Sequence, residues 1–165
     1  MQLYIVRHAE AVDVGEAGVQ TDEARFLTAR GVEQSRRVGR LFRDLRIPVD
    51  GLWTSPLIRA RQTAEHLASE LASPLEPVET AELAPPGQLG QLLGRADASG
   101  AAHLIVVGHE PYLGELLRRL ATGSATGTMP MSKASVACID FRGPTASRLV
   151  WLLPNPTIHA LRATD

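Results

Sequence analysis

The chain has 165 residues, enough for one domain with a sizeable core and too few for two large ones. Its net charge of −1 excludes the broad basic field that would attract nucleic acid or an anionic membrane, so neither partner is expected. The single cysteine, Cys138, excludes an intrachain disulfide. With no secretory leader and no apolar stretch near the roughly 20 residues of a membrane helix, we expect a cytoplasmic protein.

A short apolar run opens the chain and ends in charged residues. Residues 3–6 predict a strand buried on both faces, which is typical of a parallel sheet covered by helices. Arg7 and His8 follow at its carboxyl end, where such sheets bind their ligands. We therefore expect these two side chains to contribute to an anion site. Glu10 either orients an arginine or faces solvent.

A loop and a helix come next. Residues 12–26 are rich in Gly, Asp and Glu without a hydrophobic period, which predicts a surface loop. Thr28 is a suitable N-cap for a helix whose apolar positions continue to Leu45. The opposite face of this helix carries Arg36, Arg37, Arg40 and Arg43. Solvent exposure is the favoured interpretation of these arginines, and docking to an acidic partner is the alternative.

The second strand, residues 51–54, leads directly into a second helix. Ser55 is predicted to cap this helix, with Pro56 at its first position. Arg59 then falls in the first helical turn and faces back towards the end of the strand. Residues 77–80 predict a short third strand, which a turn and a short helix follow.

The fourth strand, residues 104–107, is as apolar as the first and leads through Gly108 to His109 and a further helix. Residues 136–141 and 147–152 predict two strands with no helix between them, so they form an antiparallel hairpin. The residues beyond are interpreted as a tail. Alternating strands and helices predict a mainly parallel sheet of about six strands, with one antiparallel strand and helices on both faces. Without a repeat or linker, residues 1–165 are predicted to form a single domain.

Polar residues follow three of these strands: Arg7 and His8 the first, Ser55 and Arg59 the second, and His109 the fourth. Because the carboxyl ends of parallel strands share one edge of a sheet, these residues should converge. Arginine offers a planar fork of donors to phosphate oxygens, and a neutral imidazole is a competent nucleophile. The pattern therefore predicts phosphoryl transfer. The sequence has no Walker-type loop, zinc-spaced Cys/His cluster or magnesium-type carboxylate set.

Three motifs in this order resemble those of the histidine phosphatase superfamily, also called phosphoglycerate-mutase-like. They are Arg7-His8-Ala9-Glu10, residues 55–64, and Gly108-His109-Glu110-Pro111. The helix start at residues 27–31 is also similar. The small size and the Arg-His-Ala-Glu-Ala form most resemble the bacterial phosphohistidine phosphatase branch. The resemblance implies a three-layer α/β/α sandwich built on a mixed sheet.

The resemblance also implies a role for each matching residue. His8 would be the nucleophile and would carry the phosphoryl group as phosphohistidine until water hydrolyses it. Arg7 and Arg59 would bind the phosphoryl oxygens. His109 would lie opposite His8 and donate a hydrogen bond to the phosphoryl group. No metal and no organic cofactor is implied.

The chain departs from the family at one place. Many members carry a glutamate general acid in the loop after the third strand, where Pro85 stands here. Glu82 is the candidate replacement, although a surface carboxylate is the favoured interpretation. Without an acid an alkoxide leaves poorly, whereas a protonated phosphohistidine releases its imidazole readily. The missing acid therefore favours a phosphohistidine substrate.

Three functions fit these residues. The leading one is a metal-independent phosphatase that acts on phosphohistidine in a protein through a covalent intermediate on His8. The alternative is a phosphatase of small phosphomonoesters, and the third is a non-catalytic phosphate-binding or scaffolding domain. The predicted partner is accordingly a phosphorylated protein or a small phosphorylated substrate, and the oligomeric state is open, a monomer included. Lys133 is interpreted as a solvated lysine.

Overall fold

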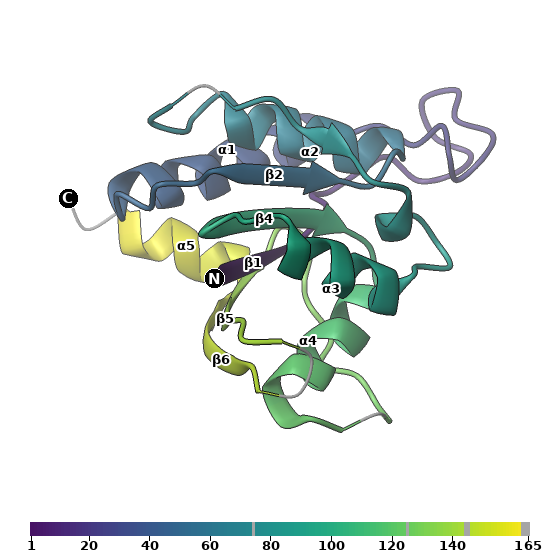
Figure 1. The fold of residues 1–165 in the computed structure, drawn as a ribbon. Helices are drawn as coiled ribbons and strands as arrows, with labels where there is room; N and C mark the ends of the chain where they lie inside the picture. The colour runs from purple at the N-terminus through teal and green to yellow at the C-terminus, as the bar shows by residue number, and fades with distance from the viewer. Residues whose placement is uncertain (74, 125, 144–145, 163–165) are drawn as a thin grey trace.

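The computed structural model describes residues 1–73, 75–124, 126–143 and 146–162, which build one six-stranded sheet between two helical layers (Figure 1). The strands are β1 (Gln2–Arg7), β2 (Gly51–Thr54), β3 (Val78–Glu79), β4 (His103–Gly108), β5 (Val136–Asp140) and β6 (Arg148–Leu153). They lie side by side in the order β3-β2-β4-β1-β5-β6. β5 is antiparallel to both of its neighbours and the other pairs are parallel, which confirms the predicted mixed sheet.

Helices cover both faces of this sheet, which confirms the three-layer architecture (Figure 1). One face packs against α1 (Ala29–Asp44), α2 (Ile58–Ala68) and α5 (Asn155–Arg162). The other packs against α3 (Leu89–Ala98) and α4 (Tyr112–Thr122). A short 3-10 helix, η1 (Ala81–Leu83), follows β3. No helix among the described residues is long and apolar enough to cross a membrane.

The central strands are buried on both faces because each helical layer covers one of them. In β1, Tyr4 and Val6 belong to the core beneath α1 and α2, whereas Leu3 and Ile5 belong to the core beneath α3 and α4. Successive side chains of a strand point to opposite faces, so a strand between two helical layers is apolar throughout. The unbroken apolar runs of the sequence therefore mark strands at the centre of the sheet.

The parallel register aligns the ends of β2, β4 and β1 at one edge of the sheet. β1 ends at Arg7, opposite Gly108 at the end of β4. The peptide N–H of His8 donates to the carbonyl of Gly108 at 2.9 Å. That of Ser55, just after β2, donates to the carbonyl of Val107 at 2.9 Å. The chain therefore leaves three adjacent strands at the same level.

Helix α1 begins where the sequence predicts and is tied to the loop after β1. Thr28 Oγ1 accepts from the peptide N–H of Gly31 at 3.0 Å and donates to Glu10 Oε1 at 2.9 Å. Glu10 also forms an ion pair with the exposed Arg30 at 3.4 Å. Glu10 thus joins the start of α1 to the segment that carries His8.

The arginine face of α1 is engaged within the molecule and is not simply solvated. Arg40 and Arg43 form ion pairs with Glu70, just beyond the end of α2, at 3.4 and 3.2 Å. Arg37 donates to the side chain of Asn155, at the start of α5, at 3.0 Å. These contacts tie α1 to its two neighbours on the same face of the sheet. Docking of an acidic partner to this face stays a prediction.

Two local predictions are wrong. Ser55 does not cap the second helix, because α2 begins at Ile58 with Leu57 as its N-cap and no side-chain capping bond. The hydroxyl of Ser55 instead accepts from the peptide N–H of Leu57 at 3.3 Å and reaches His109. The segment after β6 is no tail but forms α5, whose Ile158 is fully buried in the core.

Gly31 lies where α1 approaches the backbone after β1. A Cβ there would overlap the carbonyl oxygen of Glu10, whereas a Cβ at Gly94 in α3 would meet nothing. We expect Gly31→Ala to lower the unfolding free energy by about 1–3 kcal/mol, because the backbones must separate. The matched control Gly94→Ala should raise it by about 0.5–1 kcal/mol, because alanine loses less entropy in a helix. Urea unfolding measures both, and equal effects would contradict the close approach.

Candidate active site

His8, His109, Arg7 and Arg59 come together at the edge of the sheet where β1, β2 and β4 end. The ring centroids of His8 and His109 are 5.0 Å apart, with 50° between the ring planes. Both arginines act electrostatically on both histidines. His8, His109 and Arg59 are buried, with exposed fractions of 6, 3 and 4%. The three motifs therefore meet in one place.

The His8 ring is held in one orientation and one tautomer. Its Nδ1 lies 2.8 Å from the carbonyl oxygen of Ala9, which can only accept, so Nδ1 carries the proton and Nε2 the lone pair. Burial lowers the pKa of His8 to about 3; the bond to Ala9 opposes this, and the charges of Arg59 and Arg7 add to it. His8 is therefore a neutral imidazole at neutral pH. Its Nε2 atom has the lone pair that a nucleophile needs.

The loop after β1 is also tied to helix α2. The peptide N–H of Ala9 donates to Thr63 Oγ1 at 3.0 Å, and that hydroxyl donates to the carbonyl of Arg59 at 2.7 Å. Thr63 is fully buried. The link fixes the backbone beside His8 relative to the turn of α2 that carries Arg59. Thr63 lies within the second motif, but no sequence signal pointed to this role for its hydroxyl.

His109 uses one ring nitrogen for a bond within the protein and leaves the other unused. Its Nε2 lies 2.8 Å from Ser55 Oγ. Its Nδ1 is buried and has no hydrogen-bond partner among the described residues. Burial lowers the pKa of His109 to about 4, with Arg59 and Arg7 acting in the same direction and Asp22 against it. His109 is thus neutral at neutral pH and carries a proton on only one nitrogen.

The two arginines also have unused donors. Nε of Arg7 and Nε of Arg59 are buried without a hydrogen-bond partner in the part of the chain that the structure describes. Together with Nδ1 of His109 they are three buried nitrogens without a hydrogen-bond partner among the described residues. A buried polar group left unpaired costs about 1–3 kcal/mol. A phosphoryl group would supply oxygens to such donors, so the site fits this anion.

Asp22 belongs to this site, although the sequence placed it in a surface loop. Arg59 Nη1 donates to the carbonyl of Asp22 at 2.7 Å, and Nη2 to its carboxylate at 2.8 Å. Arg25 donates to the other carboxylate oxygen at 3.1 Å. Burial raises the pKa of Asp22, but the bonds to Arg25 and Arg59 outweigh it and leave the pKa below its ordinary value. An ionised Asp22 therefore fixes the guanidinium of Arg59.

Glu110 and Arg7 both bond to the backbone of Met131. Glu110 Oε1 accepts from the N–H of Met131 at 3.0 Å, while Arg7 Nη1 donates to the carbonyl of Met131 at 2.7 Å. Further along, the N–H of Ala134 donates to the carbonyl of Arg7 at 3.1 Å. The segment of residues 131–134 is thus fastened to the end of β1. Lys133 in this segment lines a cleft of about 760 Å³.

Glu82, the candidate acid, is engaged elsewhere. Its carboxylate forms an ion pair with Arg95 at 3.4 Å, and the guanidinium of Arg95 lies 4.8 Å from the ring centroid of Trp53. No hydrogen bond or ion pair within the described residues joins Glu82 to His8 or His109. With 18% of its side chain exposed and Arg95 as its partner, Glu82 is a paired carboxylate and not a freely solvated one, and an acid role for it stays a prediction.

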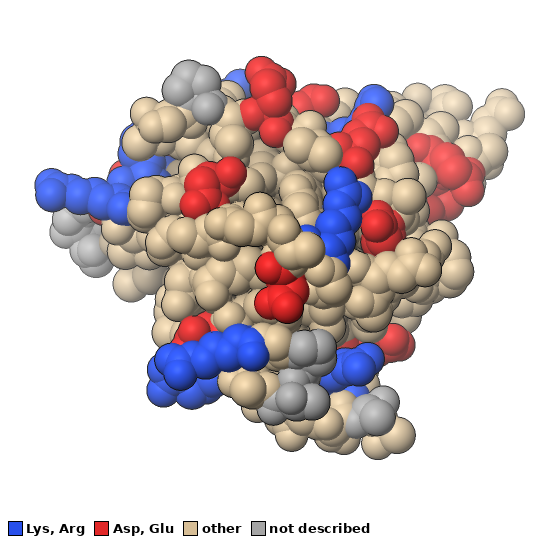
Figure 2. Space-filling model, in the orientation of Figure 1, with Lys and Arg blue, Asp and Glu red and all other residues tan. Residues whose placement is uncertain are grey.

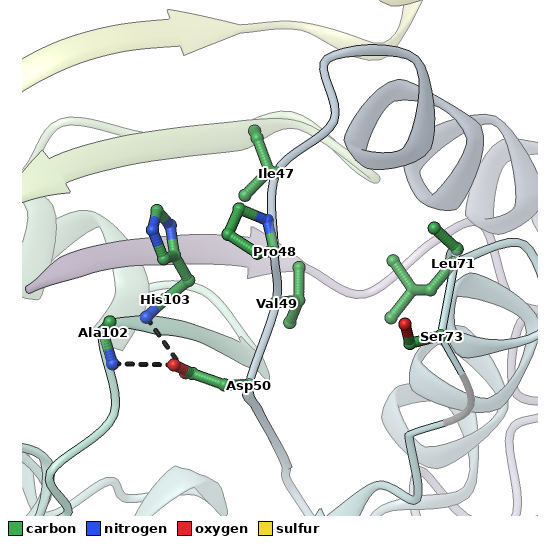
Figure 3. A pocket seen from close by; sticks show the side chains of 9 residues that line it. Ile47, Pro48, Val49, Asp50, Leu71, Ser73, Ala102 and His103 are labelled. Atoms are coloured by element: carbon green, nitrogen blue, oxygen red, sulfur yellow. Dashed lines mark hydrogen bonds between the residues drawn. The ribbon is translucent and has the colours of Figure 1, made fainter.

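A separate hollow of about 440 Å³ lies at the amino-terminal ends of β2 and β4 (Figure 3). Asp50 there accepts from the peptide N–H groups of Ala102 and His103, at 2.9 and 3.0 Å. His103 begins β4, whereas His109 follows its end, so the length of a strand separates this hollow from the site. The hollow is therefore separate from the candidate active site.

The charge that could bind an anion is local. The face in Figure 2 carries basic and acidic side chains interspersed, in keeping with a net charge of −1. Attraction for a phosphoryl group must therefore come from the arginines at the strand ends. Within the described ranges, no group of three or more His, Cys, Asp or Glu residues is placed to hold a metal ion.

Comparison with known proteins supports a common ancestry. A family model for the histidine phosphatase superfamily (branch 1) matches residues 3–84. An uncharacterized protein of Picosynechococcus sp. is 38% identical over 139 residues, which cover 82% of each chain. Phosphohistidine phosphatase SixA of Escherichia coli is 27% identical over 146 residues, covering 87% of this chain and 88% of its own. The structure of the protein histidine phosphatase SixA complexed with tungstate has a TM-score of 0.84 at 26% identity, covering 96% and 99% of the two chains.

This chain belongs to the histidine phosphatase superfamily, and it is a hydrolase of the phosphatase class. The family fold agrees with the three-layer sandwich and its single antiparallel strand.

Asp22 offers a test of how Arg59 is positioned. Asp22→Ala removes the carboxylate that fixes Nη2, so we expect phosphatase turnover to fall by about ten- to a hundredfold. Asp13→Ala is the matched control, because Asp13 pairs at 2.7 Å with Arg25 in the same loop. Steady-state kinetics on one substrate compare the variants. Equal losses would show that the loop matters and the Asp22–Arg59 pair does not.

The buried histidines predict a loss of stability in acid. Burial lowers the pKa of His8 to about 3 and that of His109 to about 4, against about 6.5 in an unfolded chain. Below about pH 6.5 the unfolded state binds protons that the folded state does not bind. The unfolding free energy therefore decreases as the pH is lowered. At about pH 5 each histidine should have cost about 2 kcal/mol. Urea unfolding at about pH 7 and pH 5 measures this effect in the parent and in His109→Gln. The unfolding free energy should decrease less between the two pH values in the variant than in the parent. The same loss in both would contradict a lowered pKa for His109.

Proposed function

We propose that this chain, acting as one domain, dephosphorylates phosphohistidine on a protein, with His8 as its nucleophile. The observation that carries the proposal is the neutral His8 ring. Its Nδ1 is held by Ala9, and its Nε2 lone pair is available beside Arg7, Arg59 and a second buried histidine. Similarity to the phosphohistidine phosphatase SixA along 88% of that protein supports the substrate class.

In the first step, Nε2 of His8 forms a bond to phosphorus while the P–N bond of the substrate breaks. The reacting substrate is the protonated phosphohistidine, whose other ring nitrogen carries a proton. The bonding electrons return to the substrate nitrogen that was bound to phosphorus, and a neutral imidazole leaves. His8 becomes a cationic phosphohistidine, whose Nδ1–H is stabilised by the carbonyl of Ala9. Arg7 and Arg59 offset the charge of the phosphoryl oxygens, and His109 donates a hydrogen bond to them.

In the second step, water attacks phosphorus in line with the Nε2–P bond. The electrons of that bond return to Nε2, and dihydrogen phosphate keeps both protons of the water. His8 is restored as a neutral ring. The reaction thus balances with no further reactant.

The surroundings of the leaving group support phosphohistidine over an alkyl ester. Pro85 stands where many family members carry the general acid, and Glu82 is paired with Arg95. An alkoxide would have to leave without a proton donor, whereas an imidazole needs none. The proposal therefore follows from the leaving group that this site can release.

The test supplies a phosphohistidine-carrying protein and, separately, a panel of alkyl phosphomonoesters. We expect the parent to release phosphate faster from phosphohistidine than from the esters. His8→Ala should lower this rate by about a thousandfold or more, because the covalent route is lost. His66→Ala, which changes a histidine of α2 outside the site, is the control.

Three other outcomes would contradict part of this proposal. Faster hydrolysis of alkyl esters would favour the small-phosphomonoester phosphatase. Equal rates for the parent and His8→Ala would remove His8 as the nucleophile. Phosphate binding by a parent that turns over no substrate would favour a non-catalytic phosphate-binding domain.

A further inference from the structure

Ser55 and His109 form a buried pair at the ends of two adjacent strands. Ser55 follows β2 and is fully buried, and its Oγ lies 2.8 Å from Nε2 of His109, which follows β4. The same oxygen accepts from the peptide N–H of Leu57 at 3.3 Å. Neither motif assigned a partner to this hydroxyl. The pair therefore needs an account of which atom donates.

The hydroxyl can satisfy both bonds in only one way. Its oxygen already accepts from Leu57, and its single hydrogen needs an acceptor. Nε2 of His109 is the acceptor in reach among the described residues. If Nε2 carried the proton instead, the hydroxyl hydrogen would be left buried without an acceptor, at about 1–3 kcal/mol. The arrangement therefore favours a bare Nε2.

A neutral imidazole with a bare Nε2 carries its proton on Nδ1. That atom is buried in His109 and has no partner within the described structure. An N–H there can donate a hydrogen bond to a phosphoryl oxygen, whereas the lone pair of a bare Nδ1 would repel that oxygen. The protonated Nδ1 is thus the form of His109 that suits an anion site.

We propose that Ser55 is a positioning residue that holds His109 as the neutral Nδ1–H tautomer, so that His109 offers a hydrogen bond to the phosphoryl group without becoming charged. Ser55 itself touches no substrate in this scheme. The effect on turnover rests on the proposed function, whereas the tautomer does not.

The proposal gives the two histidines complementary roles through two different acceptor–donor contacts. The carbonyl of Ala9 accepts from Nδ1 of His8 and leaves a lone pair on Nε2. The hydroxyl of Ser55 donates to Nε2 of His109 and leaves a proton on Nδ1. Two neutral rings with centroids 5.0 Å apart thus provide one nucleophile and one donor. Neither ring needs to exchange a proton with solvent before the reaction.

The direct test is the tautomer of His109, read from the nitrogen resonances of ¹⁵N-histidine-labelled protein near neutral pH. The chain has five histidines, so the signals of His109 are those missing from His109→Gln. We expect the parent to show a protonated Nδ1 and a bare Nε2. Ser55→Ala should shift the population towards a protonated Nε2, and Ser55→Thr, which keeps the hydroxyl, should restore the parent pattern.

Thr54→Val is the matched control. Thr54 is equally buried, but its hydroxyl bonds the carbonyl of Ser55 at 3.2 Å and does not contact His109. The control should keep the parent tautomer. In kinetics, Ser55→Ala should lower kcat by about ten- to a hundredfold with a smaller change in KM, because donation to the phosphoryl group strengthens in the transition state.

The outcomes separate this inference from the proposed function. A protonated Nε2 in the parent, or an unchanged tautomer in Ser55→Ala, overturns the role of Ser55 even if the protein is an active phosphohistidine phosphatase. The expected tautomer in a parent that shows no such activity supports Ser55 and rejects the proposed substrate.

Discussion

The pairing of β1 with β4 is the contact from which the site is built, because one of the two histidines directly follows the end of each strand. Both strands are buried on two faces, so their register is set by side chains that must alternate between two cores. A slip by one residue would turn each apolar side chain to the wrong core and move His8 away from Gly108. The position of His8 relative to His109 is therefore as firmly set as the centre of the sheet.

Beside these two strands, the protein stabilises the buried positive charge of Arg59. It holds Arg59 almost fully buried, and the carboxylate and carbonyl of Asp22 take two of its donors. A buried guanidinium without such a partner would cost several kcal/mol. Asp22 thus pairs with both Nη atoms of Arg59, yet Nε of Arg59 stays unpaired among the described residues. The loop after β1 thus stabilises an arginine while leaving a donor for a ligand.

The sequence was sufficient for the sheet and for the motifs, and insufficient for contacts made by loops. Apolar runs and the order of elements are local patterns, and they predicted the strands that carry Arg7, His8 and His109. Asp22 could not be found this way, because the loop has other acidic residues and only its path in space brings one to Arg59. Serine before proline is typical of a helix cap, yet the hydroxyl of Ser55 bonds to His109. Helix α5 did leave a signal, since Asn155 and Pro156 are typical of a helix start.

The unpaired donors connect the stability of the fold to its chemistry. Nε of Arg7, Nε of Arg59 and Nδ1 of His109 are each buried without a hydrogen-bond partner in the described part of the chain. A buried donor that gains an acceptor avoids a desolvation cost of about 1–3 kcal/mol. In the proposed function, an oxyanion would supply these acceptors without moving side chains that are already fixed by Asp22, Met131 and Ser55. Because the donors are ordered before the anion arrives, their orientation costs little at the moment of phosphoryl transfer. In the proposed function, these unpaired nitrogens at the strand ends are the atoms that would bind the transferring group.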